Sequence, residues 1–175
     1  MQLEVFHLDE RDTIVTTQTD ARVPLRIPPQ GGWAVVLGVV ATNLTGCGVK
    51  LTTSFRDLCD DSIMKVDERS AQLVDNGDGR AFTTLDTVSN LQLCPTPTSL
   101  RNLHDQPFRF TVEVTDLDGK YGSTELTFVP FCPAGADLCT CECDQRYNLG
   151  VCPPEGPEPE PPCPAGTASS AAPTR

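Results

Sequence analysis

The densest group of residues that could do chemistry is a run of alternating cysteines, Cys139, Cys141 and Cys143. Thiolates are soft ligands, so this C-x-C-x-C run is a candidate zinc or copper site. Structural zinc sites usually combine one C-x₂₋₄-C pair with a second pair, and the run lacks that spacing. The two histidines, His7 and His104, also lie far away in sequence. Disulfide bonding is therefore the favoured interpretation, and metal binding and reactive thiols stay open as alternatives.

The chain has nine cysteines in 175 residues, a count typical of an oxidising compartment. Seven of them are expected to form disulfides: Cys59, Cys94, Cys132, Cys139, Cys141, Cys143 and Cys152. Because nine is odd, one thiol must stay free or find a partner elsewhere. Cys163, isolated beyond a Pro/Glu spacer, is the candidate for a tether or an intermolecular disulfide.

Strand geometry limits which cysteines can pair. If residues 49–55 form one extended strand, its ends lie about 20 Å or more apart at ~3.3 Å per residue. Cys47 and Cys59 then cannot reach the Cα–Cα distance of roughly 4.4–6.8 Å that a disulfide requires. Strands that run up and down place Cys59, Cys94 and Cys132 near one pole. We therefore expect Cys94 to pair with Cys59 or Cys132.

Acidic residues offer a second kind of site. Asp116 and Asp118 stand in a D-L-D-G sequence that resembles the start of a calcium-binding loop. An EF-hand needs a third oxygen ligand and a glutamate at the twelfth position, and the sequence departs from the pattern at both places. A hairpin turn is the simpler interpretation. A calcium site here would need a second loop, such as the one carrying Asp57, Asp60 and Asp61.

Catalytic chemistry has little support in the sequence. A nucleophilic triad needs a base beside the nucleophile, and His104 is the one serious candidate for that base. It stands in the polar loop R-N-L-H-D, where a surface histidine is the simpler interpretation. There is no glycine-rich phosphate loop. We predict no catalytic residues, no cofactor and no enzymatic activity.

Short β-branched or alternating runs predict an all-β protein, an antiparallel immunoglobulin-like sandwich of about seven strands. The run at 33–43 is almost continuously apolar, which indicates a central strand covered on both faces. No amphipathic helix of useful length is expected. The other strand candidates are residues 13–17, 23–27, 49–55, 62–66, 71–74, 81–93, 107–115 and 121–129.

Four segments divide the chain by composition. Residues 1–12 are expected to be a flexible start, and 13–131 the β-sandwich domain. Residues 132–152 hold five cysteines and predict a separate disulfide knot. Residues 153–175 are rich in proline and glutamate, which predicts a disordered tail.

The segment 108–129, FRFTVEVTDLDGKYGSTELTFV, resembles the last hairpin of bacterial immunoglobulin-like, PKD-type or cadherin-like modules. In those modules a V-x-V-T-D-x-D-G strand end turns into a return strand. The resemblance implies a sandwich and says little about function. The chain departs from antibody domains because Trp33 begins its apolar strand and no cysteine lies in the middle of a strand. As a whole the chain resembles bacterial surface lipoproteins that join a β-domain to a Cys/Pro tail.

Charge and hydropathy restrict the partners. A net charge of −11 and a pI of about 4.4, with no basic stripe, argue against nucleic-acid binding. No apolar run approaches the ~20 residues of a transmembrane helix, and the first residues lack the apolar core of a signal peptide. The cysteines still favour an extracytoplasmic location, with a leader that this chain does not contain.

These observations together predict a non-enzymatic binding or structural module of a cell surface or periplasm. Its partner, a protein or a surface glycan, stays open. A calcium-dependent adhesion module is one alternative, with calcium as its cofactor. A thiol or metal-binding protein that uses the C-x-C-x-C segment is the other.

Overall fold

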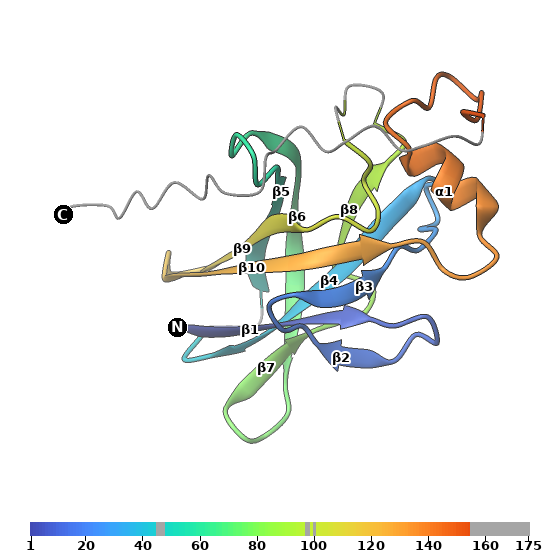
Figure 1. Cartoon of the computed structure of the whole chain (residues 1–175). Coiled ribbons are helices and arrows are strands. Elements are labelled where there is room, and N and C mark those ends of the chain that lie inside the picture. The colour runs from blue at the N-terminus through green and yellow to red at the C-terminus, as the bar shows by residue number, and fades with distance from the viewer. Residues whose placement is uncertain (45–47, 97–98, 100, 155–175) are drawn as a thin grey trace.

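The computed structural model of the chain describes residues 1–44, 48–96, 99 and 101–154. The described part is mostly β, with ten strands and one short helix, and this confirms the predicted all-β class (Figure 1). The elements are β1 (Gln2–Leu8), β2 (Ile14–Thr16), β3 (Ala21–Pro24), β4 (Trp33–Thr42), β5 (Gly48–Arg56), β6 (Ile63–Asp75), β7 (Arg80–Thr83), β8 (Ser89–Cys94), β9 (Phe108–Asp116), β10 (Tyr121–Phe131) and α1 (Asp137–Cys143).

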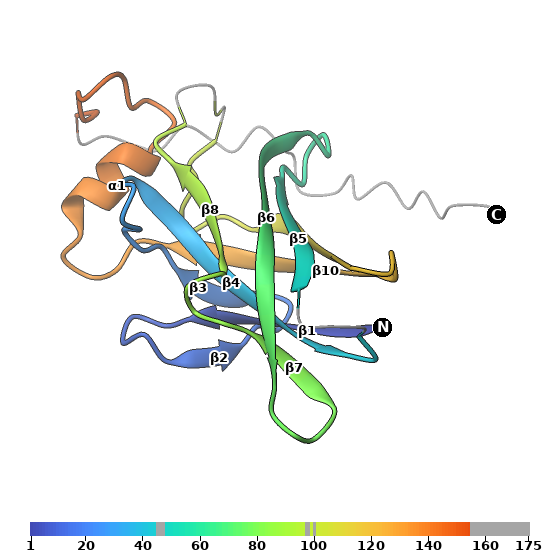
Figure 2. The ribbon, with the colours of Figure 1, turned by 180° about the vertical axis from the view of Figure 1, so that it is seen from behind.

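The strands form one hydrogen-bonded path in the order β2-β1-β4-β7-β6-β5-β9-β10-β3, and β8 pairs with β4 beside it. The path folds over so that β4 and β8 face β5, β9 and β10 across a shared core (Figures 1 and 2). Phe55, Phe108, Phe110 and Phe128 fill the centre of that core and are almost fully buried. The rings of Phe110 and Phe128 stack with their centroids 3.6 Å apart.

Strand β4 is covered on both faces, as its continuous apolar sequence predicts. Val35 and Leu37 point into the main core, whereas Val36 points into a second, smaller cluster that includes Phe6. Gly38 lies opposite Phe6 in the β1–β4 ladder. A Cβ added at Gly38 would overlap the Phe6 ring, so this glycine leaves room for the aromatic side chain.

The expectation of a flexible start over residues 1–12 is wrong. Strand β1 pairs with β4 from Gln2 to His7, and Val5, Phe6 and Leu8 are buried. The His7 ring nitrogen Nδ1 lies 2.9 Å from the Thr17 hydroxyl. Burial lowers the pKa of His7, an effect that the charge of Asp9 partly offsets.

Three further strand predictions need correction. The two short strands expected at 62–66 and 71–74 are one strand, β6, because the polar residues 67–70 between them continue the ladder with β5. The single strand expected at 81–93 is divided into β7 and β8 by a turn at 84–88. The sheet is also not wholly antiparallel, since β3 pairs with β10 in parallel.

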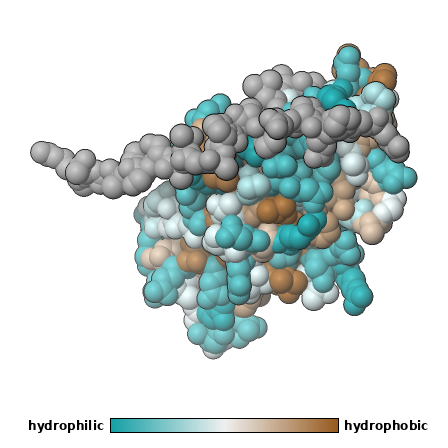
Figure 3. Space-filling view, in the orientation of Figure 1, coloured by the Kyte–Doolittle hydropathy of each residue, from teal (hydrophilic) through white to brown (hydrophobic). Residues whose placement is uncertain are grey.

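The hairpin of β9 and β10 is present as predicted, with Phe108 opposite Phe128 at its base. Its turn is closed by the amide of Gly119, which donates to the carbonyl of Asp116 at 3.0 Å. The polar side chains of the two strands lie on the outer face, where Arg109 contacts Glu125. In the orientation of Figure 1, the surface is mostly hydrophilic with small, separate apolar patches (Figure 3).

Candidate functional site

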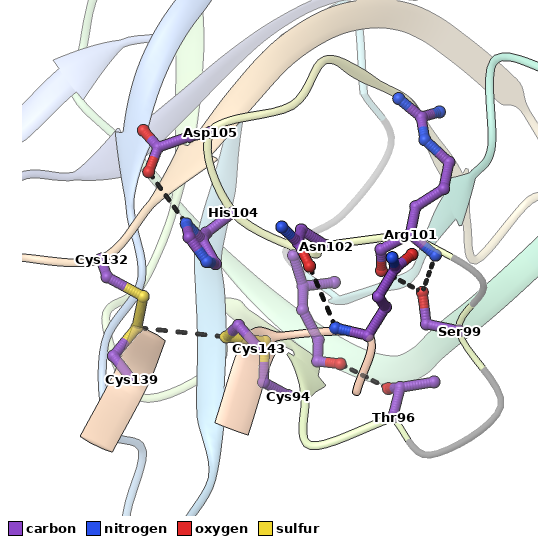
Figure 4. The surroundings of a disulfide bond; sticks show 12 residues. Cys94, Thr96, Ser99, Arg101, Asn102, His104, Asp105, Cys132, Cys139 and Cys143 are labelled. Atoms are coloured by element: carbon purple, nitrogen blue, oxygen red, sulfur yellow. Dashed lines mark hydrogen bonds and ion pairs between the residues drawn. A yellow bond between two sulfur atoms is a disulfide. The ribbon is translucent and has the colours of Figure 1, made fainter. Parts of the chain in front are cut away.

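The most distinctive site is a group of disulfides at the end of the core, beneath α1 (Figure 4). Cys94 at the end of β8 is bonded to Cys143, and Cys132, which follows β10, is bonded to Cys139. Cys139 and Cys143 are both almost fully buried and belong to the main core. The Cys-rich segment is therefore covalently joined to the β-domain and shares its core. It is not the separate knot that the sequence suggested.

The helical conformation of residues 137–143 explains where each cysteine of the C-x-C-x-C run points. At about 100° per residue, positions four apart lie on one face of a helix and the position between them lies on the opposite face. Cys139 and Cys143 accordingly face the β-domain, whereas Cys141 is bonded to Cys152 in the segment that follows. Alternating cysteines gave no helical periodicity, and seven residues are too few for an amphipathic pattern, so the sequence did not reveal α1.

The predicted partner of Cys94 is wrong. Cys94 pairs with Cys143, not with Cys59 or Cys132, because α1 brings Cys143 over the end of β8. Cys59 is also disulfide-bonded, and its partner lies outside the described residues. The expectations for Cys47 and Cys163 fall outside the described residues as well.

The loop between β8 and β9 holds α1 in place without using the disulfides. The amide of Leu103 donates to the carbonyl of Cys143 at 2.9 Å. The side-chain oxygen of Asn102 accepts from the amide of Gln145 at 3.0 Å, just after the helix. Asn102 is 7% exposed, so this polar contact is sheltered from water. Residues 101–104 of this loop are buried, whereas their polar sequence suggested an exposed segment.

Arg101 forms the charged centre of this buried loop. Its Nη1 atom lies 2.9 Å from a carboxylate oxygen of Asp57, and both side chains are largely buried. The guanidinium also stacks over the Phe108 ring, 5.1 Å from the centroid, and reaches the sulfur of Cys59 at 3.4 Å. A buried charge requires such pairing. No sequence signal marked Arg101, because its burial depends on the elements that cover the loop.

His104, the candidate base, is buried beside the disulfides (Figure 4). Its Nδ1 atom lies 2.9 Å from Asp105, whose other carboxylate oxygen accepts from Arg22. In the described residues, no hydroxyl or thiol makes a hydrogen bond with this ring. Nearby, the hydrogen bond from the Arg146 side chain holds the pKa of Asp144 below its usual value, with a smaller contribution from His104. The arrangement suits a structural ion network.

The acidic residues form the hairpin turn that was the simpler interpretation, and the two loops of the alternative calcium site lie apart. Asp116 is 5% exposed, and one of its carboxylate oxygens accepts the backbone amides of Asp118 and Lys120 at 3.1 and 2.8 Å. It closes the hairpin turn. Asp116 pairs with Val49 near the start of β5, whereas the loop with Asp57 follows the end of that strand. At ~3.3 Å per residue the two loops are about 20 Å apart, too far to share one ion.

The other two acidic candidates from that second loop have partners of their own. The Asp60 carboxylate accepts the amide of Ser62 at 2.9 Å. Asp61 is paired with Arg56 and Arg109. These carboxylates stabilise their loop and its junction with β9.

The C-x-C-x-C run does not act as one ligand set in this oxidised structure, since its three sulfurs belong to three different disulfides. Among the described residues, the one group with metal-ligand spacing is Cys132, Cys139 and Cys143, whose sulfurs lie within 4.8 Å of one another. While these sulfurs are in disulfides, they offer no thiolate to a metal.

No family model matches the sequence, and no curated protein matches it. Within the described part of the chain, no helix has the length and apolar character needed to cross a membrane.

Proposed function

We propose that the chain is an extracytoplasmic, non-enzymatic binding or structural module. The observation that carries the proposal is that every described cysteine is disulfide-bonded. Such bonds persist in secreted, periplasmic and surface proteins and are rare in reducing compartments. One of them, Cys94–Cys143, joins the C-terminal segment to the β-domain, and Cys132–Cys139 holds α1 near the end of β10, so the module would act as a single rigid body.

Two features favour binding or support over catalysis. Both histidines are buried and are engaged by neighbouring side chains, His7 by Thr17 and His104 by Asp105. The outer face of β9 and β10 carries matched charges and hydroxyls, including the Tyr121 hydroxyl, which donates to Glu113 at 2.6 Å. A polar, prearranged surface of this kind suits a protein or glycan partner, because little side-chain entropy is lost on binding.

The compartment can be tested in the organism that encodes the chain. Cells are treated with a membrane-permeant alkylating reagent before lysis, fractionated, and the cysteines are then mapped by mass spectrometry. The proposal expects the chain outside the cytoplasm with Cys94, Cys132, Cys139 and Cys143 protected as disulfides. Recovery from the cytosol with these cysteines alkylated would refute the extracytoplasmic assignment.

The absence of catalysis can be tested with a matched pair of variants. Purified protein is assayed against generic ester, peptide, phosphate and glycoside substrates, and the proposal expects no turnover above background. His104→Gln and His7→Gln are prepared in parallel, because they remove the same side chain from two buried positions. A turnover that disappears in His104→Gln but survives in His7→Gln would identify an enzyme.

A further inference from the structure

Four sulfur atoms gather at one end of the core. They come from three separate parts of the chain: Cys94 ends β8, Cys132 follows β10, and Cys139 and Cys143 lie four positions apart on α1. The sulfurs of Cys132, Cys139 and Cys143 lie within 4.8 Å of one another, and the sulfur of Cys94 is bonded to that of Cys143. Two disulfides are thus neighbours, with three potential ligands grouped together and a fourth, Cys94, bonded to one of the three.

The spacing of the three sulfurs of Cys132, Cys139 and Cys143 is close to that of a thiolate metal centre, and the sulfur of Cys94 is attached to this group through its bond to Cys143. A tetrahedral zinc ion with Zn–S bonds of about 2.3 Å holds its sulfurs roughly 3.8 Å apart. The sulfurs of Cys139 and Cys143 belong to different disulfides and are already 4.0 Å apart. Forming such a centre requires the sulfurs within each disulfide to separate, while the two on the helix keep their present distance.

We propose that the reduced protein binds one Zn²⁺ ion through Cys94, Cys132, Cys139 and Cys143. Each of the two disulfides takes two electrons and two protons from a dithiol or phosphine reductant, which gives four thiols. Zinc binding then replaces the thiol protons, which pass to solvent, and leaves four thiolates on the metal.

Burial explains why the reduced site would take a cation. Cys94 and Cys139 are fully buried and Cys143 is nearly so, and isolated thiolates are costly in such surroundings. A tetrahedral set of four sulfurs selects zinc among the common divalent ions. The hydrogen bonds from Leu103 to Cys143 and from Gln145 to Asn102 hold α1 over β8 without the disulfides, so they would keep the ligands together after reduction.

The donor set differs from the C-x-C-x-C run that the sequence suggested. Cys141 points away from the cluster and is bonded to Cys152. The proposed set instead includes Cys94, which ends β8, and Cys132, which directly follows β10. This difference supplies a matched control, since Cys141→Ser/Cys152→Ser removes one disulfide from the same helix without removing a proposed ligand.

The experiment uses the full chain, reduced with a phosphine, freed of reductant under anaerobic conditions and titrated with Co²⁺ as a spectroscopic probe. We expect one Co²⁺ per chain, the intense visible absorption of a tetrahedral thiolate complex, and displacement of the cobalt by one equivalent of Zn²⁺. Cys141→Ser/Cys152→Ser should give the same spectrum. Cys139→Ser/Cys143→Ser should bind about 100-fold more weakly or not at all, because it lacks half of the ligands.

Near-ultraviolet circular dichroism, recorded before and after metal addition, shows whether the core is folded in each sample. A reduced wild-type protein that binds no cobalt, whether folded or unfolded, would overturn the proposal. So would loss of binding in Cys141→Ser/Cys152→Ser, or the weak absorption of an octahedral complex. None of these outcomes bears on the extracytoplasmic function proposed above, which concerns the oxidised protein.

Discussion

Replacing Cys94 and Cys143 together by alanine removes the disulfide that closes the longest loop among the described bonds. Alanine is chosen because a serine hydroxyl in this buried position would lack a partner and add a cost of its own. The matched control is Cys132→Ala/Cys139→Ala, which removes the neighbouring disulfide from the same helix.

The expected loss of stability follows from loop length. A disulfide reduces the entropy of the unfolded chain by an amount that grows with the logarithm of the closed loop. Cys94 and Cys143 are 49 positions apart, which corresponds to about 4 kcal/mol at 25 °C. Cys132 and Cys139 are only 7 positions apart, which corresponds to about 2.4 kcal/mol. The first pair should therefore cost about 1.6 kcal/mol more than the second.

Urea unfolding monitored by the fluorescence of Trp33 is a suitable assay. Trp33 is the one tryptophan of the chain, is 7% exposed, and pairs with Cys94 in the β4–β8 ladder. Free energies should be compared rather than midpoints, because an unfolded chain with one cross-link fewer exposes more surface and increases the slope.

Equal losses in the two variants, or a larger loss in the Cys132→Ala/Cys139→Ala control, would refute the loop-length reasoning. Native contacts around the sulfurs would then determine the stability of this region.

Three other predictions concern the β-domain. Burial lowers the pKa of His7, so the folded protein favours the neutral ring. The free energy of unfolding should therefore be at its full value above about pH 6.5 and decrease as the pH falls below that value. His7→Gln should flatten this part of the stability–pH curve, and an unchanged curve would contradict the prediction. Arg101→Met should destabilise the protein by roughly 3 kcal/mol or more, because it leaves the buried Asp57 carboxylate without its ion-pair partner. In urea unfolding, adding Asp57→Asn to the same chain should recover part of that loss. Gly38→Ala should cost about 1–3 kcal/mol because the new methyl group overlaps the Phe6 ring. Adding Phe6→Leu should recover part of this loss in a thermal melt, and a double variant no more stable than Gly38→Ala would contradict the overlap as the cause.

Strand patterns in the sequence were informative wherever one face of a strand meets the core. The alternation in residues 108–115 and the continuous apolar run at 33–43 located β9 and β4. Strand β6 was less clear, because its backbone pairing with β5 continues through the polar residues 67–70, which lack an alternating apolar pattern. β1 was overlooked because its burial depends on pairing with the distant β4.

The site was harder to predict than the fold. The sequence indicated disulfides, but their pairing depends on how α1 is placed, and the helix itself had no periodic signal. Arg101 and Asn102 looked like surface residues because a polar loop is usually exposed. Arg101 is buried against Asp57 and the Phe108 ring. Asn102 is buried where the segment after α1 packs on the loop, and neither contact can be inferred from the local sequence. The two-loop calcium site depended on tertiary structure in the same way. Both loops are rich in aspartate, but Asp116 lies beside the start of β5 and the loop with Asp57 follows its end.

The Cys94–Cys143 bond also has a mechanical consequence. When the chain is pulled from its two ends, the segment between these cysteines cannot lengthen while the bond is intact. That segment contains the whole β9–β10 hairpin and most of α1. At ~3.3–3.6 Å per extended residue, the 49 positions between the two cysteines correspond to roughly 160–175 Å of chain that cannot extend while the loop is closed. A protein held under tension would extend by at least that length only when a reductant also cleaves Cys132–Cys139 and Cys141–Cys152, because these two bonds close shorter loops that begin inside the segment.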